Sequence, residues 1–476
     1  MKAVKNYLTD GLKKFSVPLG ICLIFFIFYS ILGVVRHNYY GSFGADLGFI
    51  DRQFWIYSHF SLDGLLTGSH FEFTSLFLSS LYWLWSDPRM LIIFQAFVIT
   101  FSGVAVFLLA KRRKLKSILC YIILLSYLTF FGIQNALWFD VHSSVWGTAF
   151  FMWFIYFLDT NNRRASIITF FLTIGSKENM AAYVFLFTVV YFLMTRKKDA
   201  LLFVFASIAY LLLLFKIVFP AILPKGYTYS SSQGLVSGSP FQLFDSAIKR
   251  ETLFYTFAWF GFVPLLLPLY AIPILGNLAS YFILGREYVA AHEIFMHYRV
   301  DLAPLLVSST IFVIGRFRRL NSIFTAVYLL ICLLFFQYTL HSPLSYLTKS
   351  WFWTKPSGVD SINKLIKEIP HDSDLAAQNN IFPHVSQRRK ITLIWPDERT
   401  FKKNSPCGKQ NCPWLRWDGS PKYIVVDLSP EWDIRHLLWQ NNEYKMAING
   451  LEKEKIISLH QQVGTAKLYI VNKKPK

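Results

Sequence analysis

Long stretches of this sequence contain no charged side chain. They include residues 15–35, 90–110 and 117–136. A helix rises 1.5 Å per residue, so each stretch is close to the ~20 residues that cross about 30 Å of hydrocarbon. Charged residues make up only 16% of the chain, whereas about 25% is typical of soluble proteins. We therefore expect an all-α polytopic membrane bundle.

The positive charge of the chain follows a pattern along the sequence. The formal net charge is +20, and much of it lies in short clusters between apolar runs, at 111–116, 163–164, 196–198 and 316–319. Short basic loops are typical of the cytoplasmic side of membrane proteins. The charge therefore indicates topology, and we expect no nucleic-acid partner. Four lysines precede a first apolar run that is too long for a cleaved signal peptide, so we expect a retained first span and a cytoplasmic N-terminus.

Placing the basic clusters in the cytoplasm predicts about 11 spans within a transmembrane domain of residues 1–340. The apolar segment 165–175 is an exception, since 11 residues reach only about 17 Å as a helix. It ends at Ser176-Lys177-Glu178. Prolines 264, 268 and 273 predict kinked or broken helices over 253–290.

The composition changes at residue 341, where charged and apolar residues become mixed. "KYIVVDLS" and "KLYIVNKK" are typical of strands, and "INKLIKEIP" is typical of a helix that ends at its proline. We expect a small soluble α/β domain over 341–476. The number of crossings places this domain outside the cytoplasm.

Five cysteines divide into two groups. Cys22, Cys120 and Cys332 lie in apolar runs and are expected to be small buried side chains. Cys407 and Cys412 lie in the polar C-terminal part, where a disulfide, two free thiols or a metal site are open. No further metal ligands stand close by in the sequence, which favours the disulfide.

Four polar segments interrupt the apolar pattern, and the count of crossings places all of them on the outer side. Ionisable residues near a bilayer are costly and are candidates for function. Lys177 and Glu178 follow a helix too short to reach the far surface, which predicts a water-filled cavity. Simpler roles are open: a helix cap for Asp51, a neighbouring charge pair at 177–178, a hydrogen-bonded interfacial His142, and a snorkelling Arg299. The candidates are Asp46 and Asp51; Asp140 and His142; Lys177 and Glu178; and His297, Tyr298 and Arg299.

These residue types suit one reaction class. A carboxylate on an outer loop can act as a general base toward a hydroxyl, and Lys177, His297, Arg299 or a bound divalent ion can neutralise a departing phosphate. An apolar groove between helices can hold an isoprenoid tail. We therefore expect sugar transfer from a polyprenyl-phosphate donor to a glycan, lipid or protein acceptor. A transporter or lipid flippase, or a non-catalytic membrane scaffold, are the alternatives.

Several motifs together resemble the DUF2079 family of predicted membrane proteins. "ADLGFIDRQFW" resembles its first acidic motif, although Arg52 separates the second acid from Gln53. "FDVHSS", "GSKEN" and "MHYRVDLAPLL" resemble its next three elements in order. "AAQNNIFPHVSQ" resembles an outer-domain stretch that reads Ala-Gln-Asn…Pro-His-x-Ser.

That family is similar to the GT-C superfamily of integral membrane glycosyltransferases. The resemblance implies an inverting transfer in a bacterial or archaeal plasma membrane, with Asp46 as the catalytic acid of the first outer loop and an interfacial helix over 50–60. Asp140 and His142 would hold a divalent ion or orient the donor. The C-terminal domain would contribute to acceptor recognition. The substrate-binding residues would be Asp51, Lys177, Glu178, His297, Tyr298 and Arg299.

The two C-terminal cysteines give a first testable prediction. If Cys407 and Cys412 form a disulfide, neither thiol should react with an alkylating reagent until the protein is reduced. Mass spectrometry of the labelled peptide measures this. Ready labelling of both residues without reductant would contradict the disulfide.

Overall fold

A computed structural model describes residues 2–63, 70–222, 243–283, 289–399 and 412–473, without the side chains of 2–15, 289, 398, 399 and 412. The chain divides into two compact units. The first, here called the helical unit, contains Met1–Leu32, Gly64–Leu78 and Ile92–Leu347. The second, the mixed unit, contains Gly33–Asp63, Ser79–Leu91 and Thr348–Lys476.

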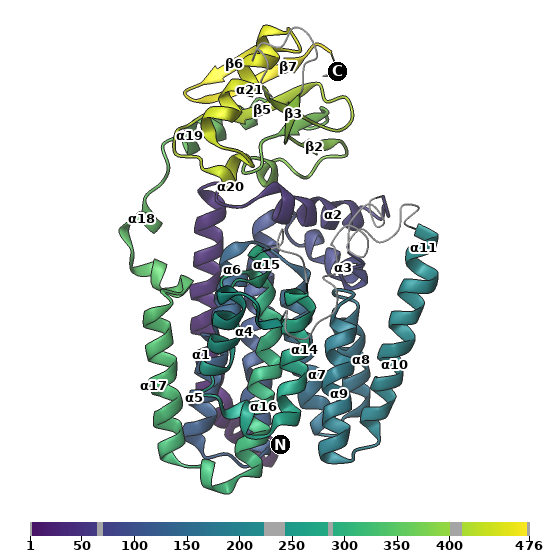
Figure 1. Ribbon diagram of the computed structural model, residues 1–476, viewed down its shortest axis with the longest axis vertical. Coiled ribbons are helices and arrows are strands. Elements are labelled where there is room, and N and C mark those ends of the chain that lie inside the picture. Colours follow the sequence, from purple (N-terminus) through teal and green to yellow (C-terminus); the bar gives the residue numbers. More distant parts are fainter. Residues whose placement is uncertain (1, 64–69, 223–242, 284–288, 400–411, 474–476) are drawn as a thin grey trace. The chain divides into compact units, whose positions relative to one another are not determined.

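The helical unit is an assembly of helices that run alongside one another (Figure 1). It holds most of α1 (Lys2–Asn38) and of α4 (Pro88–Arg112), which both continue into the mixed unit. The other helices are α3 (Phe73–Leu78), α5 (Ser117–Leu128), α6 (Phe131–Phe139), α7 (Ser143–Asp159), α8 (Arg163–Ile174), α9 (Met180–Thr195), α10 (Asp199–Leu213), α11 (Phe219–Ile222), α13 (Ala247–Ala258), α14 (Pro268–Phe282), α15 (Val289–His292), α16 (Leu302–Arg316) and α17 (Ile323–Thr339).

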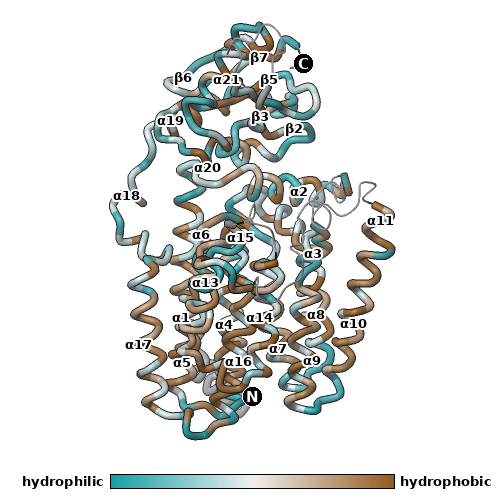
Figure 2. Tube along the Cα trace, viewed as in Figure 1, coloured by the Kyte–Doolittle hydropathy of each residue, from teal (hydrophilic) through white to brown (hydrophobic). Residues whose placement is uncertain are grey.

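Long apolar helices confirm the predicted helical class (Figure 2). By length and composition, five helical stretches in the described residues could cross a membrane, and two shorter apolar helices accompany them. The predicted number of about 11 spans stays a prediction. The five stretches are Ser16–Asn38, Pro88–Arg112, Ser117–Phe139, Asp199–Ile222 and Ala290–Arg316.

The short helix expected before Lys177 is confirmed. Helix α8 has 12 residues, and the side chain of Asn162 caps its start by accepting the N–H of Ala165 at 3.2 Å. Its far end is covered by the segment before α3, because the N–H of Thr74 donates to the carbonyl of Gly175 at 2.8 Å. A methyl group on Gly175 would lie only 2.8 Å from Oγ1 of Thr74. The chain therefore turns at 175–179, well inside the length of its longer neighbours.

The proline-rich stretch is broken, as predicted. A short 3-10 turn, η5 (Val263–Leu266), separates α13 from α14. Pro268 occupies the first turn of α14, where the missing N–H costs no hydrogen bond. Gly261 has φ of +58°, a conformation that glycine adopts without steric cost.

The basic loops gather at one end of the helical unit. Buried Asp159, at the end of α7, forms ion pairs with Arg112, at 3.0 Å, and with Arg113. Lys197 donates to the Asp159 carbonyl at 2.7 Å. A methyl group on Gly315, at the end of α16, would lie 3.3 Å from Cβ of Arg113. Loops that are far apart in the sequence therefore share one end of the bundle.

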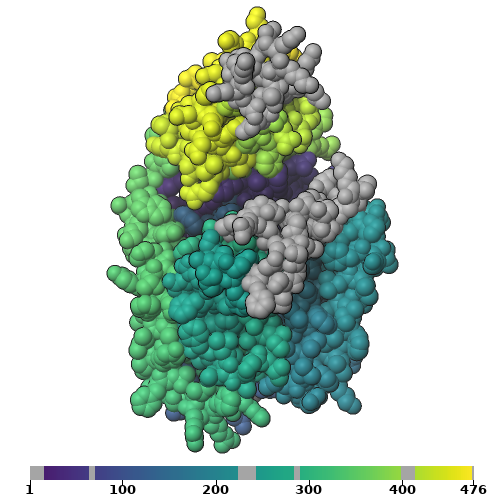
Figure 3. Space-filling view, in the orientation of Figure 1, coloured from purple at the N-terminus to yellow at the C-terminus, as the bar shows by residue number. Residues whose placement is uncertain are grey.

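The mixed unit is built on a five-stranded sheet with the order β2-β1-β5-β7-β6. Strands β2 (Ile391–Leu393), β1 (Leu375–Ala377) and β5 (Tyr423–Asp427) are parallel. Strands β7 (Ala466–Val471) and β6 (Ile457–Val463) pair antiparallel on the β5 side. Figure 3 shows the surface of these C-terminal residues in green to yellow. All five residues of β5 are buried, as its run of apolar side chains predicts.

Helices and a hairpin complete the mixed unit. Helix α19 (Gly358–Lys367) packs on β6 and β7, and α21 (Asn441–Lys453) packs on β4 and β6. Strands β3 (Trp395–Arg399) and β4 (Cys412–Arg416) form a separate antiparallel pair. Strand β5 lies within the predicted strand at 422–429, and β7 overlaps the one predicted at 467–474. Helix α19 overlaps the predicted helix at 362–370 but begins four residues earlier and ends before Pro370. Cys407 and the side chain of Cys412 lie outside the described residues, so the expected disulfide stays a prediction.

The segment between α1 and α2 (Phe49–Ser58) folds into the mixed unit. Tyr40 is fully buried in its hydrophobic core, and its hydroxyl donates to Oδ1 of Asn363 at 2.8 Å. The ring of His384 stacks on both His37 and Tyr40, with centroids 4.2 and 3.9 Å apart. The mixed unit therefore combines three separate stretches of sequence, whereas the prediction drew one division at residue 340.

Close packing around Gly44 generates a stability prediction. A methyl group on Gly44 would lie 2.7 Å from Cβ of Phe382 and 2.8 Å from Cδ1 of Leu393. We expect Gly44→Ala to lower the unfolding free energy by about 1–3 kcal/mol, the usual cost of overpacking. The midpoint of thermal unfolding in detergent measures it. Gly20→Ala in α1 is the matched control, since nothing lies within 4 Å of its added methyl group. Equal loss in both variants would contradict the prediction.

Candidate functional site

Candidate residues of the helical unit lie at the end of its helices away from the basic loops. Asp140 follows α6 and His142 precedes α7, whose other end is Asp159. Lys177 follows α8, whose first residue is Arg163. His297 begins the 3-10 turn η7 (His297–Asp301), which leads into α16. These segments form one polar end, which we call the polar cluster.

Lys177 is the half-buried cation of the polar cluster. Its Nζ lies 5.9 Å from the centroid of the Tyr298 ring. Burial lowers the pKa of Lys177, but the nearby carboxylates of Glu178, Asp301 and Glu72 raise it, and the net result lies above its ordinary value. The ammonium is therefore charged at neutral pH. Residues from distant parts of the helical unit therefore lie near Lys177.

Glu178 is buried and has a defined partner. Its Oε1 lies 2.7 Å from Nδ1 of His70, and its Oε2 accepts the N–H of Phe71 at 3.2 Å. The expected substrate-binding role stays a prediction. The observed contacts fix the segment before α3 on the end of α8.

Glu72 is a buried carboxylate of the same cluster that no sequence pattern predicted. Its Oε1 accepts from Oγ of Ser143 at 2.7 Å, and its Oε2 accepts from Oγ of Ser75 at 3.4 Å. Burial raises the pKa of Glu72, while nearby His70 and Lys177 lower it. The signal in the sequence was an acid inside "HFEF", an otherwise aromatic stretch beside a histidine.

Two histidines from different helix ends stack on each other. The rings of His142 and His297 have centroids 3.8 Å apart and an interplanar angle of 21°. Tyr298 lies 4.1 Å from His297 and stacks on Tyr281 at 5.0 Å. Among the described residues, Nδ1 of buried His297 has no hydrogen-bond partner. This nitrogen is free for a ligand that enters the polar cluster.

Arg299 is fully buried and bonds mainly to its own loop. Its Nε donates to the carbonyl of Glu293 at 3.2 Å and its Nη2 donates to the carbonyl of Ala291. The guanidinium lies 5.0 Å from the centroid of Tyr281. Its Nη1 has no partner within the described part of the chain. Arg299 therefore shapes the loop before α16, with one N–H group left for a ligand.

Asp140 and His142 were expected to bind a metal ion, but no third ligand from His, Cys, Asp or Glu joins them among the described residues. The described residues contain no group of three or more His, Cys, Asp and Glu that could hold a metal ion. The carbonyl of Asp140 accepts from Nε2 of Gln95 at 3.1 Å, which fixes the turn between α6 and α7. We therefore derive no step through a metal ion.

Asp46 and Asp51 belong to the mixed unit. Asp46 is half-buried in the π-helical turn η1 (Gly44–Gly48), which continues directly into α2. Asp51 is fully buried, and its carboxylate accepts hydrogen bonds from Tyr82, Ser386 and, at 3.1 Å, Gln387. All three donors lie in the mixed unit. Its observed role is structural, because it ties α2 to the segment that resembles Pro-His-x-Ser, and the expected substrate contact stays a prediction.

A cavity of about 570 Å³ lies beside α2 within the mixed unit. Arg52 crosses its edge and donates to the carbonyl of Arg389 at 2.8 Å. Aromatic and charged side chains suit a polar molecule such as a sugar. The lining includes Arg52, Trp55, His59, His371, Arg389 and Lys390.

Comparisons with known proteins agree on a membrane protein of this architecture. A family described as "Predicted membrane protein (DUF2079)" matches residues 46–431. The structure of ArnT from Cupriavidus metallidurans bound to undecaprenyl phosphate is 12% identical, with a TM-score of 0.53, and the match covers 96% of this chain and 98% of that one. The apo structure of the same protein is 13% identical, with a TM-score of 0.51, and covers 97% and 98%. This likeness confirms the expected GT-C-like fold. None of the curated proteins matches the sequence.

The buried carboxyl of Asp51 generates a pH prediction. Burial raises its pKa to about 7, although three hydrogen bonds lower it, whereas an unfolded chain has a value near 3.9. The folded state binds this proton more tightly, so the stabilisation is complete below about pH 4 and is lost as the pH rises through 7. At about 1.4 kcal/mol per pKa unit, the loss amounts to about 4 kcal/mol.

Thermal unfolding of wild type and Asp51→Asn between pH 4 and 8 measures this loss. The difference between their midpoints should change in favour of the variant as the pH rises. Asp63→Asn, at an exposed acid of the same unit, should run parallel to the wild type. A constant difference between wild type and Asp51→Asn would refute the assignment.

Proposed function

Because the chain belongs to the DUF2079 family of predicted membrane proteins, with a fold like that of ArnT, we propose that it is an integral membrane glycosyltransferase. It transfers a sugar from a polyprenyl-phosphate donor to an acceptor outside the cytoplasm. The carrying observation is the likeness over 96% of this chain to a structure bound to undecaprenyl phosphate.

The two ends of the helical unit support the side on which transfer takes place. Basic loops lie around Asp159 at one end, and the polar cluster lies at the other. The positive-inside tendency places the basic end in the cytoplasm, so the polar cluster faces the outside of a bacterial or archaeal plasma membrane. A transporter is less well supported, because the cations of the basic end pair with Asp159, whereas the unpaired polar atoms of His297 and Arg299 lie at the other end.

The cations of the polar cluster suit the donor phosphate. Lys177 is charged and half-buried, where an ion pair with phosphate is stronger than in water. Nδ1 of His297 and Nη1 of Arg299 are two further nitrogen atoms of this cluster that have no hydrogen-bond partner among the described residues. A phosphate gains negative charge as it leaves, so donors placed beforehand stabilise the transition state more than the ground state. Tyr298 flanks this position, and Asp140 and His142 orient the sugar.

Asp46 is the general base in this proposal. Its carboxylate accepts the proton of the acceptor hydroxyl while that oxygen forms a bond to the anomeric carbon. The bond between the anomeric carbon and the phosphate oxygen breaks, the configuration inverts, and polyprenyl phosphate leaves with the electron pair. The cavity beside α2 is the candidate acceptor site, in line with the expected role of the C-terminal domain.

Release of polyprenyl phosphate tests this function. Purified wild type should release it from a panel of polyprenyl-phosphate sugars, and Asp46→Asn should be slower by about 10²–10⁴-fold, the usual contribution of a general base. Lys177→Gln should also lose activity, since the phosphate then loses the positive charge of Lys177. Lys364→Gln, at an exposed position of α19, is the matched control and should behave as wild type. Equal release by wild type and Asp46→Asn would rule out the assigned base.

A further inference from the structure

We propose that Asn379 is a positioning residue that holds the turn carrying Asp46. The activity part of this inference rests on the proposed function, in which Asp46 is the base. The structural part stands on contacts within the mixed unit. Asn379 lies two residues after β1, in the "AAQNN" stretch.

Asn379 binds the N–H groups that begin the turn. The N–H of Gly44 donates to the carbonyl of Asn379 at 2.7 Å and to its Oδ1 at 3.0 Å. The N–H of Ala45, directly before Asp46, donates to the same Oδ1 at 3.2 Å. The first N–H groups of a helical turn have no partner inside the turn. Asn379 therefore acts as a cap that comes from more than 330 positions away in the sequence.

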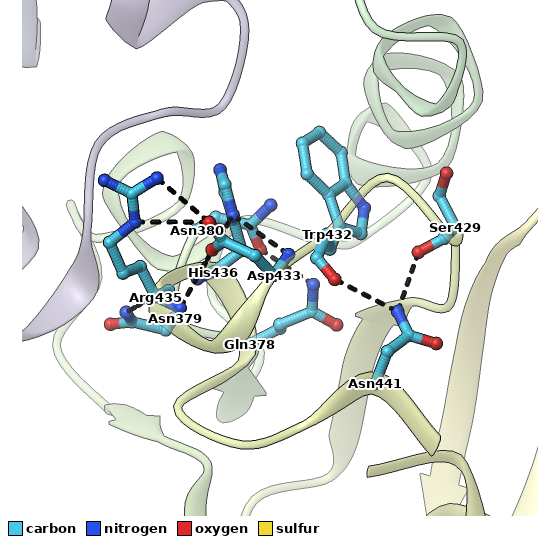
Figure 4. A network of polar contacts seen from close by, with 9 residues as sticks. All are labelled: Gln378, Asn379, Asn380, Ser429, Trp432, Asp433, Arg435, His436 and Asn441. Atoms are coloured by element: carbon cyan, nitrogen blue, oxygen red, sulfur yellow. Dashed lines mark hydrogen bonds and ion pairs between the residues drawn. The ribbon is translucent and has the colours of Figure 1, made fainter. Parts of the chain in front are cut away.

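The amide of Asn379 is itself fixed. It lies at the end of β1, is 2% exposed, and donates from Nδ2 to the carbonyl of Arg435 at 2.7 Å (Figure 4). Its neighbours are tied too: Gln378 donates to Oδ1 of Asn380 at 2.7 Å and accepts the N–H of Asp427 at 2.9 Å. The acceptor for the turn is thus also held by contacts outside the turn, and such supporting contacts limit the movement of a functional group.

Phe382 closes the turn from the other side. A methyl group on Gly48 would lie 2.4 Å from Cδ1 of Phe382, and one on Gly44 would lie 2.7 Å from its Cβ. The ring of Phe382 also meets that of Phe49 edge-on, with centroids 5.5 Å apart. The turn has a glycine at each end because a side chain there would collide with Phe382. The turn that carries Asp46 is therefore held by Asn379, through hydrogen bonds, and by Phe382, through packing.

The chemistry of the contact requires an amide. The side chain must accept two N–H groups with its oxygen and donate an N–H to the Arg435 carbonyl. Alanine can do neither. Aspartate can accept both N–H groups but cannot donate to the carbonyl when ionised, so Asn379→Asp should retain the contact to the turn in part.

Hydrogen exchange of the full-length protein in detergent tests the contact independently of activity. In Asn379→Ala the amide of Ala45 should exchange faster than in wild type, and in Asn379→Asp it should exchange at an intermediate rate. The amide of Gly44 keeps the main-chain carbonyl of residue 379 as an acceptor, so its exchange should change less. Asn363→Ala is the matched control. It removes the hydrogen bond from Tyr40, four residues before the turn, without touching Gly44 or Ala45. Its exchange at these two amides should equal that of wild type.

Kinetics separate positioning from folding. Asn379→Ala should lower kcat for sugar transfer by about ten- to a hundredfold, since a misplaced base loses rate in this range, with the KM for the donor unchanged. Asn379→Asp should recover part of kcat. The thermal midpoint of each variant monitors general unfolding. Unfolding would lower the active fraction of both variants. It would not make kcat recover in Asn379→Asp in step with hydrogen exchange at residues 44–45.

Three outcomes decide the proposal. Unchanged exchange at Ala45 in Asn379→Ala would overturn the side-chain contact. Faster exchange with an unchanged kcat would overturn the positioning role. If wild type transfers no sugar from any donor, the proposed function fails, and exchange at 44–45 alone then decides whether Asn379 holds the turn.

Discussion

The mixed unit depends on hydrogen bonds between two stretches that are more than 330 residues apart. Asn379 caps the turn that carries Asp46, and Ser386 and Gln387 bind the carboxylate of Asp51 one helical turn later. A turn and a short helix would not keep one conformation alone, because isolated helices of this length are marginal in water. The folded loop 378–387 supplies the missing partners. Buried polar groups that are fully paired favour one arrangement over others.

Charge is separated along the helical unit in a similar way. At the basic end, Asp159 neutralises cations from two other loops. At the polar cluster, Glu178 and Glu72 are engaged by His70, Ser143 and Ser75. Burying an unpaired charge is costly, so paired acids support the fold. Nδ1 of His297 and Nη1 of Arg299 are among the buried atoms that have no partner within the described residues. The clustering of ionisable residues in the sequence pointed to this end of the helical unit. Their hydrogen-bond partners then separate the residues that support the fold from those that can bind a ligand.

Much of the fold and part of the site could be predicted from local pattern. The lengths of apolar runs gave the helices, and an unusually short run predicted that α8 ends before Lys177. Interruptions of the apolar pattern found Asp140, His142, Lys177 and His297, which the fold brings to one end. Glu72 and His70 could not be predicted as members of the polar cluster, because a single acid beside aromatic residues has no distinctive spacing. Asp51 looked like a site residue because its three partners are distant in sequence.

The sequence by itself determined that the chain is a helical membrane protein with a C-terminal α/β part, because hydrophobic length and charge distribution are local properties that the bilayer reads directly. Only the tertiary structure decided that residues 33–63 and 79–91 fold with the C-terminal sheet, and that Asn379 and Phe382 enclose the Asp46 turn. These contacts depend on which hydrogen-bond donors and acceptors meet after the chain has folded. The spacing of residues within 44–51 or within 379–387 does not predict that these two stretches pair.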